Sequence, residues 1–305
     1  MSVSLEELIA DCRPYTDLGH VASYIPELKK GNPANLGVCL LSCTGTYQQA
    51  GDCTVPFSIQ SIVKPILLLQ ALLDNGTAAV RAHVGVEATG KPFDAINYTD
   101  QVLDSQHLNP MVNMGAIAIC SLIRGASYEE RFQRLLALAQ LLAGESKVYV
   151  NEGVYHSEKA NGSKNRALAY LLKTYGIIQD DVEDVLDCYF RACAISTDCI
   201  GLARIGCVLA NQGRRPGAEE AVIPPEYARF VNAILTTCGM YDGSGDFAVR
   251  VGVPAKSGVG GGIMAVVPSR MGIGIFSPSL DAKGNSLAGI RLLELLSQQL
   301  DLSIF

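Results

Sequence analysis

The chain has few residues in the arrangements that hold metal ions. Its four histidines show no metal-ligand spacing, and none of its ten cysteines forms a Cys-x-x-Cys pair. Zinc sites are built from closely spaced cysteine and histidine ligands, so a zinc centre has little support. We therefore expect no metal site.

Long apolar runs and basic runs are also absent. No run approaches the roughly 20 apolar residues that a membrane-spanning helix needs. The N-terminal segment carries Glu6, Glu7 and Asp11, where a secretory signal would be basic and then apolar. The net charge is −6, without the basic patch that nucleic-acid binding requires. We expect a cytoplasmic protein that binds neither membrane nor nucleic acid.

The ten cysteines lie in apolar surroundings, such as Val38-Cys39-Leu40 and Gly206-Cys207-Val208. In a small secreted protein so many cysteines would indicate disulfides, but this chain is long and has no export signal. Reduced thiols in the core are the better interpretation.

The sequence is rich in apolar residues and in helix patterns. Hydrophobic residues make up 49% of 305, which is enough for a large core. An N-terminal helix is predicted over Leu5 to Cys12, and a buried helix over Ile62 to Leu73 that stops at Asn75-Gly76. Further helices are predicted over Met114 to Ile123, Tyr128 to Leu142, Asn165 to Tyr175, Ile200 to Ala210 and Leu287 to Leu300.

Strand patterns occur near the two ends of the chain. They cover Leu36 to Ser42, Thr46 to Ala50, Phe247 to Val253, Gly261 to Val267 and Met271 to Phe276. The first two, separated by Thr44-Gly45, are predicted to form a hairpin. We expect an α/β (α+β) protein with one sheet-containing domain, residues 1–76 and 216–305, and a helical insertion, residues 77–215. The cleft between them is the predicted site.

A serine and a lysine stand one helical turn apart at the start of the buried helix, in Ser61-Ile62-Val63-Lys64. Pro65 is tolerated only in a first turn, which supports a helix start near Ile62. A buried lysine has a lowered pKa, so a neutral Lys64 amine could take the proton of Ser61. The alternative is structural, with Ser61 as an N-cap and Lys64 reaching solvent.

A second pattern, Lys256-Ser257-Gly258, follows near the C-terminal strands, and together the two patterns have the layout of serine-lysine acyl transferases. Glycines here would let a substrate lie close to the strand backbone. The amides of Val259 and Ser61 could form an oxyanion hole. The alternative is a glycine-rich bulge or turn. Neither a phosphate-binding Gly-Lys-Ser/Thr nor a Gly-x-Ser-x-Gly elbow is present.

Longer segments of the chain resemble the bacterial and mitochondrial glutaminases. Those segments are Val21-Ala22-Ser23-Tyr24-Ile25-Pro26, Phe57-Ser58-Ile59-Gln60-Ser61-Ile62-Val63-Lys64-Pro65, Asn109-Pro110-Met111-Val112-Asn113-Met114-Gly115-Ala116-Ile117, Ser157-Glu158 with Asn165-Arg166-Ala167, Asp187-Cys188-Tyr189-Phe190, Gly239-Met240-Tyr241-Asp242 and Pro254-Ala255-Lys256-Ser257-Gly258-Val259. They follow the family's order from residue 21 to 289.

The resemblance implies a serine β-lactamase/penicillin-binding-protein-like fold, with an antiparallel sheet flanked by helices and an all-helical insertion. It also implies hydrolysis of L-glutamine to glutamate and ammonia through a glutamyl-serine ester, without a cofactor, in a homo-oligomer. The residues it assigns are Ser61 as nucleophile, Lys64 as base, Tyr241 in proton transfer, Val259 and Ser61 as oxyanion-hole amides, Glu158 facing the α-ammonium, and Tyr24, Asn113, Asn165 and Tyr189 around the α-carboxylate.

Two other functions stay open at this point. A penicillin-recognising serine hydrolase would share both short patterns, but such enzymes work outside the cytoplasm. A non-catalytic amino-acid-binding protein of the same fold would bind glutamine without producing ammonia, and the intact Ser61-Lys64 pair argues against it.

Overall fold

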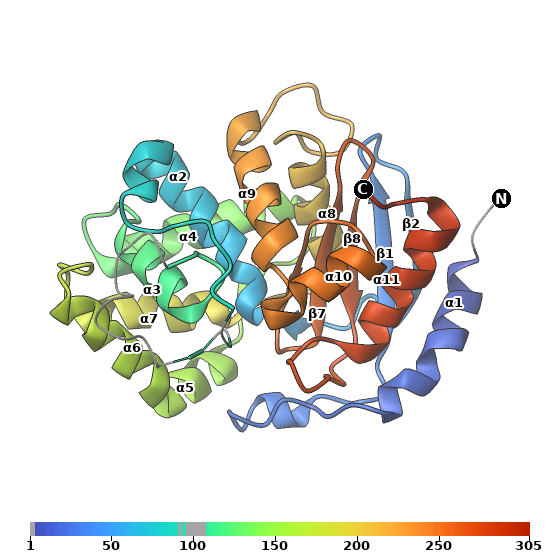
Figure 1. Ribbon diagram of the computed structural model, residues 1–305, viewed down its shortest axis with the longest axis horizontal. Helices are drawn as coiled ribbons and strands as arrows, with labels where there is room; N and C mark the ends of the chain where they lie inside the picture. The colour runs from blue at the N-terminus through green and yellow to red at the C-terminus, as the bar shows by residue number, and fades with distance from the viewer. Residues whose placement is uncertain (1–3, 91, 93, 96–107) are drawn as a thin grey trace.

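The main sheet is built from both ends of the chain. A computed structural model describes residues 4–90, 92, 94–95 and 108–305, and its five-stranded antiparallel sheet has the order β2-β1-β8-β7-β6 (Figure 1). The strands are β1 (Gly37–Ser42), β2 (Tyr47–Gly51), β6 (Ala255–Ser257), β7 (Gly262–Val267) and β8 (Met271–Phe276). Strand β1 pairs with β2 in the predicted hairpin and with β8 along its whole length. The two ends of the chain therefore meet in one sheet, as predicted.

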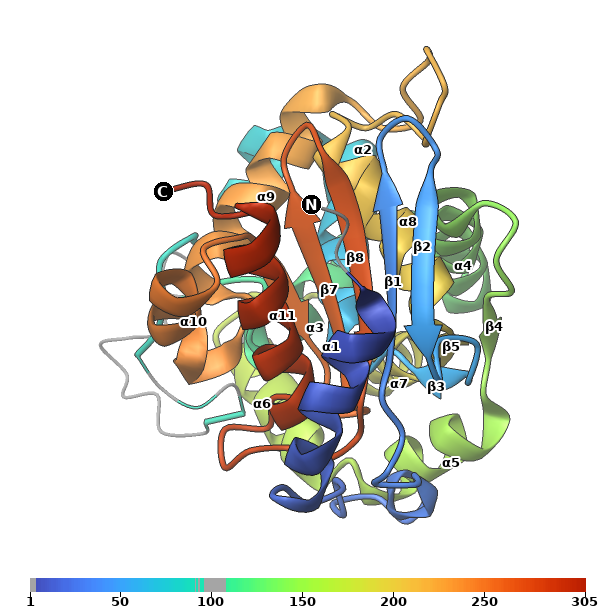
Figure 2. The ribbon, with the colours of Figure 1, turned by 90° about the vertical axis from the view of Figure 1, so that its right-hand side faces the viewer.

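Helices cover both faces of this sheet. Alternate side chains of a strand point to opposite faces, so Val38 and Leu40 of β1 pack with α1 (Leu5–Cys12) and α11 (Leu287–Leu300), seen in front of the sheet in Figure 2. Cys39 and Leu41 point the other way, into the larger core that contains α8 (Cys199–Ala210). Helix α8 lies close to β8, where a Cβ at Gly272 or Gly274 would collide with its backbone.

The remaining helices form most of the second part of the molecule, beside the sheet in Figure 1. They are α2 (Val63–Arg81), α3 (Asn113–Ser121), α4 (Tyr128–Ala143), α5 (Glu152–Asn161), α6 (Ser163–Thr174) and α7 (Val182–Cys193). Helix α9 (Pro225–Cys238) packs on α2 and α8, and α10 (Ser244–Arg250) lies beside α11 and contributes Phe247 to the smaller core. A second small sheet, in the order β3-β5-β4, consists of β3 (Phe57–Ser58), β4 (Tyr149–Val150) and β5 (Ile195–Thr197). Among the described residues no helix is both long and apolar enough to cross a membrane.

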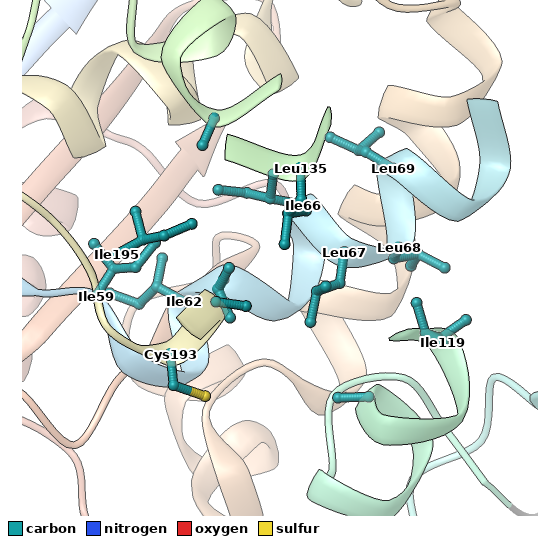
Figure 3. Close-up of a cluster of buried hydrophobic side chains, with 14 of the residues drawn as sticks. Ile59, Ile62, Ile66, Leu67, Leu68, Leu69, Ile119, Leu135, Cys193 and Ile195 are labelled. Carbon is teal, nitrogen blue, oxygen red and sulfur yellow. The ribbon is translucent and has the colours of Figure 1, made fainter. Parts of the chain in front are cut away.

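Helix α2 is the centre of the larger core. Its Ile66 and Leu69 lie beside Leu135 of α4, and its Leu68 lies towards Ile119 of α3 (Figure 3). The helix is interrupted at Gly76, which has a φ of 78°, and then continues to Arg81. The predicted stop at Asn75-Gly76 is thus a break inside a longer element. The first turn of α2, which carries Lys64, and the turn before it, which carries Ser61, also pack into this core through Ile62 and Val63.

One predicted strand is wrong. Residues Phe247 to Val253 alternate apolar and other side chains, but the structure has helix α10 over Ser244–Arg250 there. Phe247 and Val251 are both buried and stand four residues apart, which also fits one face of a helix, whereas Val249 is 88% exposed. Lys256 and Ser257 belong to the separate short strand β6, and Gly258 follows its end.

The division into two domains stays a prediction. Residues 91, 93 and 96–107 of the predicted insertion lie outside the described part of the chain. Helix α8, which lies within the predicted insertion, packs on the main sheet.

Candidate active site

Ser61 and Lys64 meet at the start of α2. Ser61 lies in a 3₁₀ turn, Gln60–Ile62, and Lys64 in the first turn of the helix that follows. The Nζ atom of Lys64 donates a hydrogen bond of 3.0 Å to Ser61 Oγ. The lysine is completely buried, and burial lowers its pKa to about 8. At pH 7 roughly a tenth of the amine is therefore neutral and available as a base, far more than for a lysine in water.

Two asparagines extend this contact across the cleft. Lys64 Nζ donates to Asn113 Oδ1 at 2.7 Å, and Asn113 Nδ2 donates to Asn165 Oδ1 at 3.0 Å. Asn113 begins α3 and Asn165 lies in the first turn of α6. The chain of hydrogen bonds fixes the orientation of both amides and joins the N-terminal ends of three helices.

Glu158 is a buried carboxylate on α5. Its side chain accepts a 2.6 Å hydrogen bond from the Tyr24 hydroxyl, which also contacts Gln60 Oε1 at 3.0 Å. Burial raises the pKa of Glu158, while the hydrogen bonds from Tyr24 and Gln60 and the charge of Lys64 oppose that shift. No salt bridge to Glu158 occurs within the described residues, so a positively charged ligand would find an unneutralised carboxylate there.

Tyr241 and Val259 approach Ser61 from the sheet side. Tyr241 has a φ of 55°, in the left-handed region that side chains rarely adopt. Burial raises its pKa, whereas hydrogen bonding with the Ser61 hydroxyl and the Val259 backbone lowers it. Lys256 Nζ lies 4.4 Å from the centre of the tyrosine ring and donates to the carbonyls of Gly239 and Ser257. The hydroxyls of Ser61 and Tyr241 and the Val259 backbone therefore converge on one point.

The glycines after Lys256 serve a different contact from the one predicted. A Cβ at Gly258 would lie 2.4 Å from the Ile59 carbonyl, and one at Gly260 would lie 2.4 Å from the Ser58 carbonyl. These glycines thus face the chain segment that leads to Ser61 and not a bound substrate. They let the two backbones touch, which sets the position of Val259 relative to Ser61.

These groups surround a cleft of about 330 Å³, a size at the lower end of small-molecule sites. Of the predicted residues, the cleft is lined by Tyr24, Ser61, Asn113, Glu158, Asn165, Tyr189 and Val259. Lys64 and Tyr241 lie behind this surface, in contact with Ser61. In the described part of the chain no three metal-ligating side chains gather, here or elsewhere.

The cleft also has lining residues that the sequence prediction missed: Gln60, Asp94, Asn161, Gly162, Lys164 and Cys193. Two of them are neighbours of predicted residues, with Gln60 next to Ser61 and Lys164 next to Asn165. Cys193 stands four residues after Tyr189 on α7, so helical spacing could have indicated it. Asp94 forms a close ion pair with Lys164, which no local pattern predicts.

A buried serine-lysine pair with a converging backbone segment, in a cleft between an antiparallel sheet and helices, defines a serine-lysine acyl-transfer hydrolase. The family model "Glutaminase" matches residues 19–305. The chain therefore belongs to the glutaminase family. It has the β-lactamase-like fold of that family and hydrolyses the amide bond of L-glutamine, so the penicillin-recognising and non-catalytic alternatives are not favoured.

Named relatives cover the whole chain. A glutaminase of Clostridium tetani is 50% identical over 100% of both chains. The structure of a probable glutaminase from Bacillus subtilis complexed with 6-diazo-5-oxo-L-norleucine is 40% identical, with a TM-score of 0.90 over 99% of this chain and 95% of that one. Another structure, also 40% identical with a TM-score of 0.90, covers 99% of this chain and 98% of its own. It is the covalent complex that a Bacillus subtilis glutaminase forms with 5-oxo-L-norleucine by reaction with the same diazo compound.

Proposed function

We propose that the chain hydrolyses L-glutamine through a glutamyl ester on Ser61, with Lys64 as the base. The observation that carries this proposal is the 3.0 Å contact between the Ser61 hydroxyl and a completely buried lysine whose pKa is about 8. A serine hydroxyl is a weak nucleophile until a neighbouring base takes its proton. Lys64 is the basic group in that position.

In the first half of the reaction, Lys64 takes the Ser61 proton as Oγ attacks the side-chain amide carbon of glutamine. The amides of Val259 and Ser61 stabilise the negative charge that develops on the amide oxygen. The carbon–nitrogen bond then breaks, and the leaving nitrogen takes a proton from Lys64, relayed by the Tyr241 hydroxyl. Ammonia departs and the glutamyl ester remains.

In the second half, water attacks the ester carbon and gives a proton to the same pair of groups. The carbon–oxygen bond to Ser61 breaks, the serine regains its proton, and glutamate is released. In each half of the reaction, Lys64 and Tyr241 first take a proton from the attacking group, which is Ser61 or water. They then return a proton to the leaving group, which is ammonia or Ser61.

The charged end of the substrate has partners at the other end of the cleft. We assign Glu158 to the α-ammonium, because its buried carboxylate has no salt bridge within the described residues. Tyr24, Asn113, Asn165 and Tyr189 are assigned to the α-carboxylate and the polar atoms near it. The Bacillus subtilis relative reacts with a compound that has an amino-acid backbone and a ketone where glutamine has its amide, which supports the same substrate geometry here.

The direct test is covalent labelling with 6-diazo-5-oxo-L-norleucine followed by peptide mapping. The label should appear on Ser61 of the wild-type protein and be lost in Ser61→Ala, which should fold normally and lose glutaminase activity by several orders of magnitude. A Ser61→Ala variant that keeps more than about a tenth of the wild-type rate would remove Ser61 from this role.

We also propose that the protein is cytoplasmic and that it forms a homo-oligomer. Ten free cysteines, nine of them buried, suit a reducing compartment. Sedimentation of the purified protein would measure the oligomeric state.

A further inference from the structure

Lys256 is a buried lysine that the proposed reaction does not use. It lies in β6, and its side chain is completely buried. Its Nζ atom donates a hydrogen bond of 2.9 Å to the Gly239 carbonyl and one of 2.8 Å to the Ser257 carbonyl. Taking an amine out of water is costly, and an apolar side chain of similar length would avoid that cost. The buried amine therefore indicates a contribution that packing alone does not make.

The contacts of Lys256 converge on Tyr241. Its Nζ atom lies 4.4 Å from the centre of the tyrosine ring, within the roughly 6 Å over which an amine cation is attracted to a ring face. Gly239, whose carbonyl accepts from Nζ, stands two residues before Tyr241 and also accepts from the Ser257 amide at 3.2 Å. Lys256 thus contacts both the ring and the backbone just before it.

Tyr241 needs such support because its backbone is strained. Its φ of 55° lies in the left-handed region, which persists only where the surrounding structure enforces it. On one side the Ser244 hydroxyl donates to the Tyr241 carbonyl at 2.8 Å and accepts from the Met240 amide at 3.0 Å. On the other side the chain lies against β6, since a Cβ at Gly239 would be 1.7 Å from the Ala255 carbonyl.

The two carbonyl contacts do not require Lys256 to be charged. Burial and the charge of Lys64 lower the pKa of Lys256. A neutral amine still has two N–H donors, and an ammonium has three. Either form can therefore donate to the carbonyls of Gly239 and Ser257.

We propose that Lys256 is a positioning residue, which holds the Tyr241 ring so that its hydroxyl stays beside Ser61 and the Val259 backbone. This inference rests on the proposed function, in which that hydroxyl relays a proton to the leaving nitrogen. A general acid contributes only from within hydrogen-bond reach of the atom that takes its proton, so a displaced ring would slow the chemical step. Lys256 does not line the substrate cleft, so binding of glutamine should not depend on it.

The first test is Lys256→Met, which keeps an unbranched side chain of similar length and removes the donors. We expect kcat for glutamine to fall roughly tenfold, a part of the hundredfold or more that a general acid contributes, while KM stays near its wild-type value. Val267→Ala is the control for a loss of stability alone, because Val267 is buried at the end of β7 away from the turn that joins β6 to β7. It should lower the unfolding temperature and leave kcat unchanged.

A double-mutant cycle with Tyr241→Phe separates positioning from a general structural effect. A residue that acts through the tyrosine hydroxyl loses its effect once the hydroxyl is gone, so Lys256→Met should lower the kcat of Tyr241→Phe by less than about twofold. Lys256→Gln, which keeps two N–H donors, should retain more of the wild-type kcat than Lys256→Met. It replaces Lys256→Met in the cycle if the methionine variant does not fold.

The outcomes separate this inference from the proposed function. If Tyr241→Phe has a low kcat but Lys256→Met lowers kcat equally with and without the hydroxyl, or not at all, the positioning role is wrong and the relay by Tyr241 stands. An equal fall of kcat in Val267→Ala, or a raised KM with unchanged kcat in Lys256→Met, would also overturn the positioning role. If Tyr241→Phe keeps the wild-type kcat, the relay itself is wrong and the role of Lys256 falls with it, whereas the ester on Ser61 is tested separately by labelling.

Discussion

Burial shifts two ionisable groups of the cleft in opposite directions. It lowers the pKa of Lys64 to about 8 and raises the pKa of Glu158. In both cases the cause is the loss of water around the charged form. For Lys64 the result is a usable base. For Glu158 it is a carboxylate whose charged form is stabilised when an ammonium binds beside it. The same physical effect thus supports both catalysis and recognition.

The pH dependence follows from the Lys64 shift. The base must be neutral in the free enzyme, so kcat/KM should rise with pH up to about 8 and then level off. Below that value the rate should fall about tenfold per pH unit, because the neutral fraction does so. Lys64→Arg should be inactive at every pH, since arginine does not lose its proton. A kcat/KM that does not change with pH below about 8, or an active arginine variant, would show that only a positive charge is needed at position 64.

Glu158→Gln tests recognition of the α-ammonium. The substitution keeps the shape and removes the charge, and a charge-assisted hydrogen bond contributes about 1.5–3 kcal/mol, so kcat/KM for glutamine should fall roughly ten- to a hundredfold. The control substrate is the analogue of glutamine without its α-amino group. Its kcat/KM should be low with wild type and should fall little further with the variant, since this analogue has no ammonium to pair with Glu158. A coupling near zero between the two changes would mean that Glu158 does not contact the ammonium.

At the scale of single residues, only part of the site could be predicted from spacing along the sequence. Ser61 and Lys64 stand one turn apart, and their contact follows from the helix alone. The contact of Tyr24 with Glu158 joins residues 134 positions apart, which no local pattern shows. The family resemblance places both residues in the site, but it does not predict their contact. The left-handed φ of 50° at Gln60, beside the nucleophile, is likewise a product of the tertiary packing.

At the scale of elements, the site depends on a close crossing of two segments. The segment leading to Ser61 and the turn after β6 touch through backbone atoms, and Gly258 leaves no room for a side chain. The position of the Val259 amide relative to Ser61 is set by this contact. A change at Gly258 should therefore affect stability and catalysis together.

Gly258→Ala should be destabilising and nearly inactive. Its Cβ would lie 2.4 Å from the Ile59 carbonyl, and overpacking of this kind costs about 1–3 kcal/mol. Thermal unfolding and kcat would both be measured, with Gly245→Ala as the control because its Cβ meets nothing within 4 Å. An alanine variant at Gly258 with unchanged unfolding temperature and unchanged kcat would contradict the proposed role of the crossing.

Long elements with one clear period could be predicted, and short or ambiguous ones could not. The helix predicted over Leu287 to Leu300 has the observed bounds of α11, and β7 begins within one residue of its prediction. Strands β4 and β5 have two and three residues, too few for a period to show. The segment Phe247 to Val253 fits both the strand and the helix pattern of apolar residues. In the structure Phe247 and Val251 pack together in the smaller core, as they can from one face of a helix.

At the scale of the whole molecule, the main sheet separates two hydrophobic cores. The smaller core joins the sheet to α1 and α11, and the larger one continues from α8 through α2 to the helices around the cleft. Cysteines are part of both cores, with Cys12 in the smaller and Cys39, Cys120, Cys193 and Cys207 in the larger. Their reactivity therefore reports on the packing of the entire chain.

The folded protein should have one readily reactive thiol out of ten. Cys43 alone is partly exposed, and a hydrogen bond with Cys207 lowers its pKa. Burial raises the pKa of other thiols, such as Cys12 to about 11 and Cys193 to about 12, and buried thiols of this kind react slowly. Titration with an aromatic disulfide should show one fast equivalent in the native state and ten after unfolding. Cys43→Ser should remove the fast equivalent, and several fast thiols in the native wild type would mean that the cores are less closed than the structure indicates.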